Sequence, residues 1–269
     1  MKPGFPFRSF PLIRAGVLAG LAVCGNLWAQ APDYNAADIV NASDFSAAPF
    51  APTSVLSLFG TNLAFTTEAV SPQALAAGTL PLDLASISVC VNNVRVPLLY
   101  ASPTQINFVL PSDLIPGDVS LAVVRQGLRG PLVTISVVAA APALFVMNGG
   151  FAIAQDWNSG YTLMTGDAPS HPGDIAILYA TGLGATNPPW PSGEVAQSAA
   201  YIAQRNNLQV LLDGVAVDPH QVLYAGVTPG YSGLYQINFV IPPGTGPNPE
   251  IRVQIGSQIS IPSVKLAVD

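Results

Sequence analysis

The chain has 269 residues, of which 50% are hydrophobic and only 9% are charged. This apolar content is too high for a disordered protein, and the length suits two domains of ordinary size. The formal net charge is −6, and the six basic residues beyond residue 29 are scattered, which argues against nucleic-acid binding and against attraction to an anionic membrane surface.

The first 29 residues predict a signal peptide. Three basic residues precede an apolar stretch at 15–23 that is too short to span a bilayer as a helix. Cleavage after Ala29 is favoured over cleavage after Ala31, which would place Pro32 beside the scissile bond. An uncleaved anchor and lipidation at Cys24 stay open as alternatives. We therefore expect a secreted, periplasmic or cell-surface protein with no membrane span after cleavage.

Three sequence stretches recur in the same order, which predicts a duplicated domain. The pairs are 51–65 with 171–185, 87–101 with 208–225, and QINFVLP (105–111) with QINFVIP (236–242). The repeat is domain-sized and occurs only twice, so a solenoid is not expected. We expect domain 1 at 30–139 and domain 2 at 140–269, the second beginning with an extra hairpin that turns at 156–160. The link at 137–145 is short and apolar, which predicts a preferred orientation between the domains.

The residue pattern of each copy predicts β-strands. Apolar side chains alternate in 54–60 and 174–180, and turns with positive φ are predicted at Asn92-Asn93 and at Asp213-Gly214. No segment has convincing helical periodicity, although 71–78 could form one turn. Roughly seven short strands per copy predict an all-β protein of two tandem immunoglobulin-like β-sandwiches. Prolines beside the strands protect sheet edges, so we expect a monomer.

The series IVNASDFS, APTSVLSLFGTNLA, YASPTQINFVLP, AAAPALF, GDIAILYATGLG and YAGVTPGYSGLYQINFVIP resembles a C-terminal domain family of secreted acidobacterial (Solibacter-type) proteins. The resemblance runs from about Ile39 to Val268. Each half also resembles the IPT/TIG subgroup of immunoglobulin-like domains, through its proline-led start and its Gly-Thr-Asn turn. The resemblance implies the sandwich fold, and it implies no agreed activity and no catalytic residues.

Enzymatic chemistry has little support in the sequence. His171 and His220 each neighbour a proline in a predicted turn, and they lack metal-ligand spacing. Cys90 falls in a strand pattern, which favours a buried small hydrophobe over a nucleophile. The stretch DWNSG (156–160) mimics the start of a calcium loop, but an Asx-type hairpin turn is favoured because Asp167 is at the wrong spacing to complete the loop. We expect no catalytic residue, no metal ligand and no cofactor.

Aromatic residues in predicted loops are the candidate ligand-binding residues. The second copy carries seven additional residues between its YA and QINF motifs, which bring Tyr231 and Tyr235. Trp190 lies among prolines, and Trp157 lies at a predicted hairpin tip. Exposed rings on rigid loops can stack on sugars or anchor a protein partner. The alternative is that these rings pack their own loops or the contact between the domains.

The polar residues of the repeated QINF motif predict a structural role. Asn107 and Asn238 are expected to hydrogen-bond the backbone of a neighbouring turn, with the YA bend as the candidate. The leading functional hypothesis is thus a non-enzymatic binding or adhesion module for an extracellular protein or glycan. A carbohydrate-binding module with exposed aromatic loops is the first alternative, and a metal-dependent hydrolase is the second.

Overall fold

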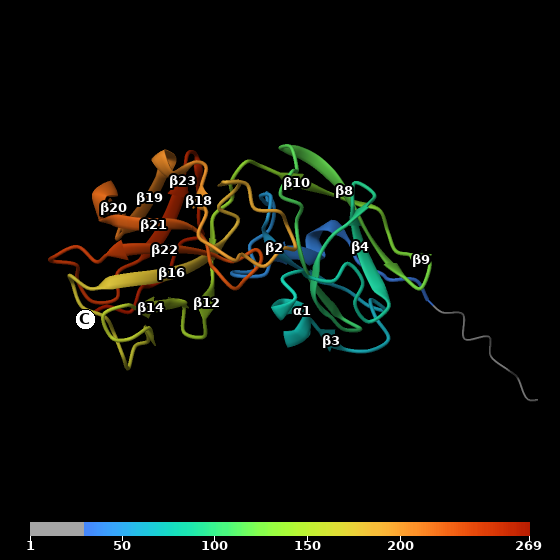
Figure 1. Cartoon of the computed structure of the whole chain (residues 1–269), viewed down its shortest axis with the longest axis horizontal. Helices are drawn as coiled ribbons and strands as arrows, with labels where there is room; N and C mark the ends of the chain where they lie inside the picture. Colours follow the sequence, from blue (N-terminus) through green and yellow to red (C-terminus); the bar gives the residue numbers. More distant parts are fainter. Residues whose placement is uncertain (1–29) are drawn as a thin grey trace, which may run out of the picture. The chain divides into compact units, whose positions relative to one another are not determined.

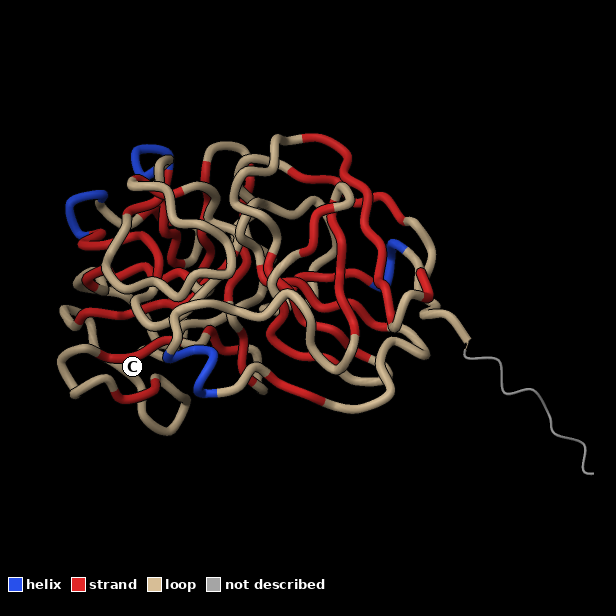
Figure 2. The backbone as a smooth tube through the Cα atoms, turned by 45° about the vertical axis from the view of Figure 1, so that its right-hand side comes forward, coloured by secondary structure: helices blue, strands red, loops and turns tan. Residues whose placement is uncertain are grey.

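A computed structural model describes residues 30–269 (Figure 1). The predicted signal peptide and the lipidation of Cys24 lie outside these residues. Strands dominate, and helices are confined to a few short turns (Figure 2). Within residues 30–269 the one α-helix, α1 (Pro72–Ala76), is the single turn expected from the sequence, and three 3₁₀ turns accompany it at Ala36–Asp38, Arg205–Asn207 and Pro219–Gln221.

The first copy forms two antiparallel sheets. One sheet has the order β1 (Ile39–Asn41), β2 (Val55–Phe59), β7 (Gln105–Val109), β6 (Leu98–Ala101), β3 (Glu68–Ala69). The other has the order β10 (Val133–Val137), β8 (Gly117–Arg125), β4 (Ile87–Val91), β5 (Val94–Arg95), with β9 (Leu128–Arg129) paired to β8. Side chains on the facing sides of the two sheets form one core, which makes this copy a sandwich.

The second copy repeats this plan and adds to it. Its larger sheet has the order β15 (Thr162–Leu163), β14 (Ala154–Asp156), β16 (Ile175–Thr181), β22 (Tyr235–Val240), β21 (Val222–Val227), β18 (Tyr201–Ile202), β17 (Thr186–Asn187), with β11 (Ala143–Leu144) also paired to β16. Its smaller sheet has the order β20 (Val215–Ala216), β19 (Leu208–Leu212), β23 (Ile251–Ile255), β24 (Gln258–Ile259). The additions include the small ribbon of β12 (Val146–Met147) with β13 (Phe151–Ala152), and the predicted hairpin of β14 with β15.

The repeated QINF motif, with the strand before it, forms the same structural unit in both copies, a bulged hairpin. In the first copy β6 pairs with β7 and the register shifts between Leu98 and Tyr100; in the second β21 pairs with β22 and the shift falls between Val222 and Tyr224. The bulge therefore occurs at the same place in both copies. An extra residue at a bulge bends its strand and increases the local twist, which is a feature that the sequence must specify.

The hairpin turns have the backbone that the sequence predicted. Asn92 and Asn93 have φ values of 48° and 65°, and Asp213 and Gly214 have 49° and 79°. Positive φ at both central residues matches the right-handed twist of the flanking strands, which is why asparagine, aspartate and glycine are favoured there. The turn chemistry thus fixes the register of both hairpins.

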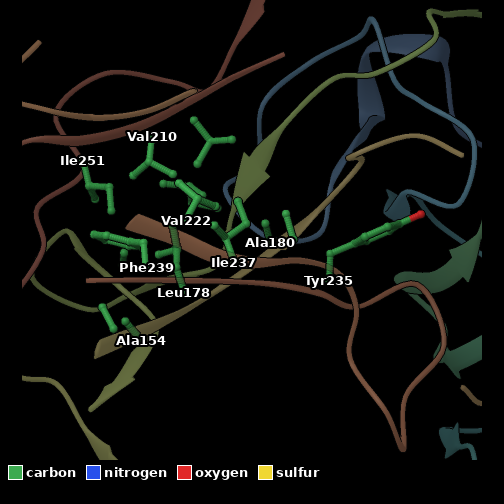
Figure 3. Packing of buried hydrophobic residues seen from close by; sticks show 14 of the residues in the cluster. Ala154, Leu178, Ala180, Val210, Val222, Tyr235, Ile237, Phe239 and Ile251 are labelled. Atoms are coloured by element: carbon green, nitrogen blue, oxygen red, sulfur yellow. The ribbon is translucent and has the colours of Figure 1, made fainter. Parts of the chain in front are cut away.

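Two separate hydrophobic clusters fill the two sandwiches. One draws its residues from Tyr34 to Val137 and the other from Ala140 to Val268. Figure 3 shows part of the second cluster, with Leu178, Ile237 and Phe239 side by side. The all-β fold of two tandem immunoglobulin-like sandwiches is confirmed, while residues 31–269 make up one compact unit. The exact boundaries between the domains stay a prediction.

Direct hydrogen bonds join the two sandwiches along a contact that we call the seam. The Val55 amide donates to the Thr181 hydroxyl at 3.0 Å, and that hydroxyl donates to the Gly233 carbonyl at 2.9 Å. Farther along, the Ser192 hydroxyl donates to the carbonyl of Leu110 at 2.6 Å. The first and third of these bonds join the end of β16 and the loop at Ser192 to β2 and to the residue that follows β7, so the short link is not the only connection between the sandwiches.

Candidate functional site

An open groove on the second sandwich gathers aromatic side chains. It has a volume of about 370 Å³, and we call it the aromatic groove. Its lining consists of Phe145, Ile153, Gln155, Leu163, Tyr179, Tyr231 and Leu234. Two tyrosine hydroxyls and one amide are the polar side-chain groups among these residues, and none of the seven carries a formal charge.

Strand alternation places this groove on the outer face of the larger sheet. Ala176, Leu178 and Ala180 of β16 point into the core, so Tyr179 points the other way. Gln155 of β14 lies opposite Ile177 of β16 and therefore shares the face of Tyr179. The side chains of neighbouring strands thus form the floor of the groove.

A hydrogen bond fixes the polar part of the floor. The Tyr179 hydroxyl donates to Oε1 of Gln155 at 2.5 Å, and Nε2 of Gln155 donates to the Tyr161 carbonyl at 3.0 Å. Burial raises the pKa of Tyr179, and the nearby hydroxyls of Tyr231 and Tyr161 raise it further. The hydroxyl consequently stays protonated and acts as a donor across the physiological range of pH.

Tyr231 stands on the loop that the second copy inserted. Tyr231 is 56% exposed, while its backbone amide and carbonyl are both hydrogen-bonded. The Tyr231 amide donates to the Thr228 carbonyl at 3.2 Å, and the Tyr231 carbonyl accepts from the Ala196 amide at 2.9 Å. An exposed ring on a held backbone loses little conformational entropy when a ligand binds.

Trp157 and Tyr161 form a second exposed aromatic feature beside the groove. Their ring centroids lie 5.0 Å apart in an edge-to-face arrangement, and each side chain is about half exposed. The buried carboxylate of Asp156 accepts hydrogen bonds from the amides of Asn158 and Ser159 at 2.8 and 3.2 Å, which builds the predicted Asx turn at this hairpin tip. The carboxylate also accepts from two serine hydroxyls, at Ser159 and Ser170.

The prediction that Tyr235 is an exposed loop aromatic is wrong, and the alternative, that its ring packs at the contact between the domains, describes it. Tyr235 begins β22, is 1% exposed and lies at the seam end of the second core (Figure 3). Its hydroxyl donates to the Gly184 carbonyl at 2.6 Å and shares a short hydrogen bond with the Thr53 hydroxyl of the first sandwich. Strand alternation turns its ring inward, with Ile237 and Phe239, and the seam covers what remains.

Trp190 packs its own loop, which is the alternative to ligand binding that the sequence left open. The ring is half-buried and packs against the second core cluster. Its indole nitrogen donates to the carbonyl of Glu194 at 3.3 Å, and its amide donates to the Thr186 hydroxyl at 3.0 Å. Trp190 is therefore a loop-packing residue that lies near the groove without lining it.

The role predicted for the QINF amides is also different from what the structure shows. Oδ1 of Asn107 accepts from Ser57 and from Gln105 on the same sheet face, at 3.0 and 2.9 Å. Asn238 accepts from Gln236 at 3.2 Å in the corresponding place. Both amides thus bond to the side chain two residues along their own strand, and Asn107 also bonds to Ser57 of the neighbouring strand β2, because strand alternation places these side chains on one face.

The histidines and the cysteine lie away from the groove. His171 stands beside Asp174 and Asp269 at 3.3 and 3.4 Å, and the strongly exposed side chain of His220 stands 2.9 Å from Asp218. Both are surface turn residues, as predicted. Cys90 is half-buried rather than fully buried, because it lies on the face of β4 opposite to Val89 and Val91, which point into the core.

The sequence reasoning missed several residues of the site. Phe145 and Tyr179 line the groove, and Tyr161 stands beside it. The alternation of DIAILYA already implied that Tyr179 points away from the core, so this residue could have been found. Phe145 follows the linker strand β11, and its amide donates to the Tyr179 carbonyl at 3.1 Å, a contact that no local pattern reveals.

Each sandwich also has one hollow at an equivalent position of the duplicated fold. Both lie between a hairpin tip and the loop that follows the QINF strand, with volumes of about 470 Å³ at Asn92 and Pro111 and about 380 Å³ at Asp213 and Pro242. Their recurrence follows from the duplicated backbone. Neither lining contains an aromatic ring, so the aromatic groove remains the stronger candidate site.

No family model matches the chain, and the search of curated proteins gave no match. The resemblance to the acidobacterial family and to the IPT/TIG subgroup therefore stays a prediction. Among solved structures, the chain is similar to SGBP-B of a mixed-linkage glucan utilization locus of Bacteroides ovatus in complex with a mixed-linkage heptasaccharide. The identity is 11% and the TM-score 0.31, over 81% of this chain and 42% of that one.

Two further structures have comparable similarity. The surface glycan-binding protein PbSGBP-B from Prevotella bryantii is 12% identical with a TM-score of 0.26, over 84% of this chain and 40% of that one. Domains 5–6 of the S-layer protein SbsC are 11% identical with a TM-score of 0.26, over 86% and 94%. The chain spans less than half the length of both glycan-binding proteins, and TM-scores this low assign no function.

Proposed function

We propose that the protein is an exported, non-enzymatic binding module whose aromatic groove takes an uncharged ligand. The observation that carries the proposal is the open groove that Tyr179 and Tyr231 line together with four apolar side chains and the Gln155 amide. Large apolar surfaces with a few fixed polar groups are typical of ligand sites, where the polar groups set the orientation of the ligand. Here those groups are the Tyr179 hydroxyl and the Gln155 amide.

The chemistry of the groove favours binding over catalysis. Its titratable lining groups are tyrosine hydroxyls, and burial raises the pKa of Tyr179 away from neutrality, which makes it a poor base. His171 and His220 do not line the groove. Export is supported by the basic and apolar pattern of the first 29 residues. Among residues 30–269, no helix is long and apolar enough to cross a membrane.

Affinity capture tests this proposal. The immobilised protein is incubated with the culture fluid and the cell-surface extract of its source organism, and captured material is analysed for protein and, after acid hydrolysis, for sugars. Tyr179→Ala and Tyr231→Ala should each lose at least about tenfold of the captured material, because aromatic anchors carry most of the energy of a binding site. The matched control is Tyr201→Ala, a similarly exposed tyrosine outside the groove.

The outcomes separate clearly. Capture of a neutral glycan or of a protein that is lost in the groove variants and kept in the control supports the proposal, and the same pattern for an acidic polysaccharide would contradict an uncharged ligand. Equal capture by all four proteins would place the binding surface elsewhere. Turnover of ester or glycoside substrates that disappears in His171→Ala would overturn the non-enzymatic assignment.

A further inference from the structure

We infer that the ligand of the aromatic groove is a linear, uncharged polysaccharide chain that lies along four rings. The rings belong to Trp157, Tyr161, Tyr179 and Tyr231, and we call them the ring row. This inference rests on the proposed function and specifies the ligand class of the same site.

Contacts between neighbouring residues set the order of the row. The rings of Trp157 and Tyr161 touch at 5.0 Å between centroids. Gln155 links Tyr161 to Tyr179, because its amide nitrogen bonds the backbone of the first and its amide oxygen bonds the hydroxyl of the second. Tyr179 and Tyr231 line the same groove. The row consequently extends from the tip of the β14–β15 hairpin to the loop before β22.

The composition of the row matches the two-sided character of a sugar ring. A pyranose has apolar C–H faces and a rim of hydroxyls, and an aromatic ring packs against the first while hydroxyl and amide groups bond the second. Tyr179 and Tyr231 offer both a ring face and a hydroxyl, and the Gln155 amide lies between Tyr161 and Tyr179. Several such units in sequence suit a repeating polymer better than a single small molecule.

An extended peptide fits this surface less well. Peptides that bind to sheets gain most of their affinity by pairing with a free edge strand. Of the strands beneath the groove, β14 and β16 are interior to the sheet, since β14 is paired with β15 and β16, and β16 is paired with β14 and β22. The edge strand β15, which carries Leu163, has only two residues and offers too few free backbone groups to pair with an extended peptide.

Charge selects against acidic polymers. The seven lining residues of the groove and the rings of Trp157 and Tyr161 carry no formal charge, and the whole chain has a net charge of −6. A polyanion would therefore meet repulsion over the surface without a compensating cation in the groove. A neutral polymer avoids this penalty.

The experiment uses the whole exported protein and a defined set of probes. Native affinity electrophoresis is run in gels that contain soluble β-glucan, xylan, galactomannan, soluble starch or, as the anionic probe, polygalacturonate. The retarding polymer is then hydrolysed to oligosaccharides, and calorimetry measures the affinity of each from disaccharide to octasaccharide. We expect retardation by at least one neutral polymer, no retardation by polygalacturonate, and affinity that rises with chain length before it reaches a plateau.

Variants of the protein show which rings of the ring row contact the polysaccharide. Tyr231→Ala and Tyr179→Ala should weaken binding of every oligosaccharide by about tenfold or more. Trp157→Ala should weaken only the longer ones, and Trp157→Phe should restore most of that loss because a ring is kept. Tyr201→Ala should bind as the wild type does. Thermal unfolding of each variant shows whether it has kept its fold, which is expected for these half-exposed side chains.

Three results would overturn the inference. They are the absence of retardation by every neutral polymer, stronger retardation by polygalacturonate, and equal affinity for a disaccharide and an octasaccharide. If the groove variants still lose a captured protein in such a case, the proposed binding function stands and only the ligand class is wrong. If capture does not depend on the groove at all, the proposed function itself fails.

Discussion

Tyr235 shows how one side chain can belong to two sandwiches. Its ring fills the end of the second core, while its hydroxyl bonds the Thr53 hydroxyl of the first sandwich and the Gly184 carbonyl of its own. Complete burial raises the pKa of Tyr235 to about 12, and the hydrogen bond from Thr53 offsets only part of this effect. The neutral form of the hydroxyl is thus part of the folded structure.

This shift predicts a loss of stability in alkali. Below about pH 10 the Tyr235 hydroxyl is protonated in both the folded and the unfolded chain, so it contributes no pH dependence. Between about pH 10 and pH 12 the unfolded chain releases the proton while the folded chain keeps it, so the free energy of unfolding falls by roughly 2–3 kcal/mol.

The phenylalanine variant isolates this contribution. Tyr235→Phe should cost about 1–2 kcal/mol at neutral pH, because the Gly184 carbonyl and the Thr53 hydroxyl each lose a partner. Urea unfolding at about pH 9 and about pH 11.5 measures the alkaline loss in both proteins. The variant should lose less stability than the wild type over this interval, and an equal loss in both would contradict the assignment.

At the scale of an element, the loop at 228–234, between β21 and β22, has two structural roles. Gly233 packs against the first sandwich, where an added Cβ would lie 2.7 Å from Cγ2 of Val55, while Tyr231 projects into the aromatic groove. The Ser232 hydroxyl between them accepts a hydrogen bond from the Gly193 amide at 3.2 Å. One short segment therefore joins the sandwiches and supplies a wall of the groove.

Two glycines of this loop form a matched pair for mutation. Gly230 and Gly233 both have positive φ, 88° and 74°, so alanine costs about 1 kcal/mol of backbone strain at either position. The space around them differs, since nothing lies within 4 Å of a Cβ at Gly230. Gly233→Ala should therefore destabilise the protein by about 1–3 kcal/mol more than Gly230→Ala, because it overpacks the seam.

Chemical unfolding compares the two variants directly. Each free energy of unfolding is measured by urea titration, and the difference between them removes the shared cost of the positive φ. Affinity for the ligand should also fall more in Gly233→Ala, because a displaced loop moves Tyr231. Equal stability of both variants would contradict this expectation, because it would show that Val55 moves aside for the added Cβ at little cost.

At the scale of the whole molecule, two cores are joined by a buried, hydrogen-bonded seam. The hydrogen bonds come from several segments. The Leu80 amide donates to the Gly193 carbonyl at 2.7 Å, the Val195 amide donates to the Gly78 carbonyl at 2.9 Å, and the Val55 amide donates to the Thr181 hydroxyl. An added Cβ at Gly182 would lie 3.0 Å from Oγ of Ser54 in the first sandwich, so the two sandwiches approach each other closely there. Loss of either sandwich would expose these groups on the other.

This arrangement predicts a single unfolding transition for both sandwiches. Differential scanning calorimetry should give one peak, with a calorimetric enthalpy equal to the van't Hoff enthalpy and, for roughly 240 folded residues, about 170 kcal/mol near 60 °C. Two resolved peaks, or a van't Hoff enthalpy near half of the calorimetric one, would show that the sandwiches unfold independently.

The local architecture could be read from the sequence because its causes are local. Alternating apolar residues define the strands, Asn92-Asn93 and Asp213-Gly214 define the turns, and the repeated QINF motif encodes the bulged hairpin twice. These features depend on a few adjacent residues and on backbone sterics. The duplication and the sandwich class followed directly from them.

The tertiary structure alone decided which aromatic rings meet solvent. Tyr231 and Tyr235 are four residues apart in one predicted loop, yet one is 56% exposed and the other 1%. Burial depends on what packs from elsewhere in the chain, and Thr53, which meets Tyr235, is 182 residues away. The same holds for Phe145 and Tyr179, which the fold brings into one groove, because no short-range pattern records a contact between distant segments.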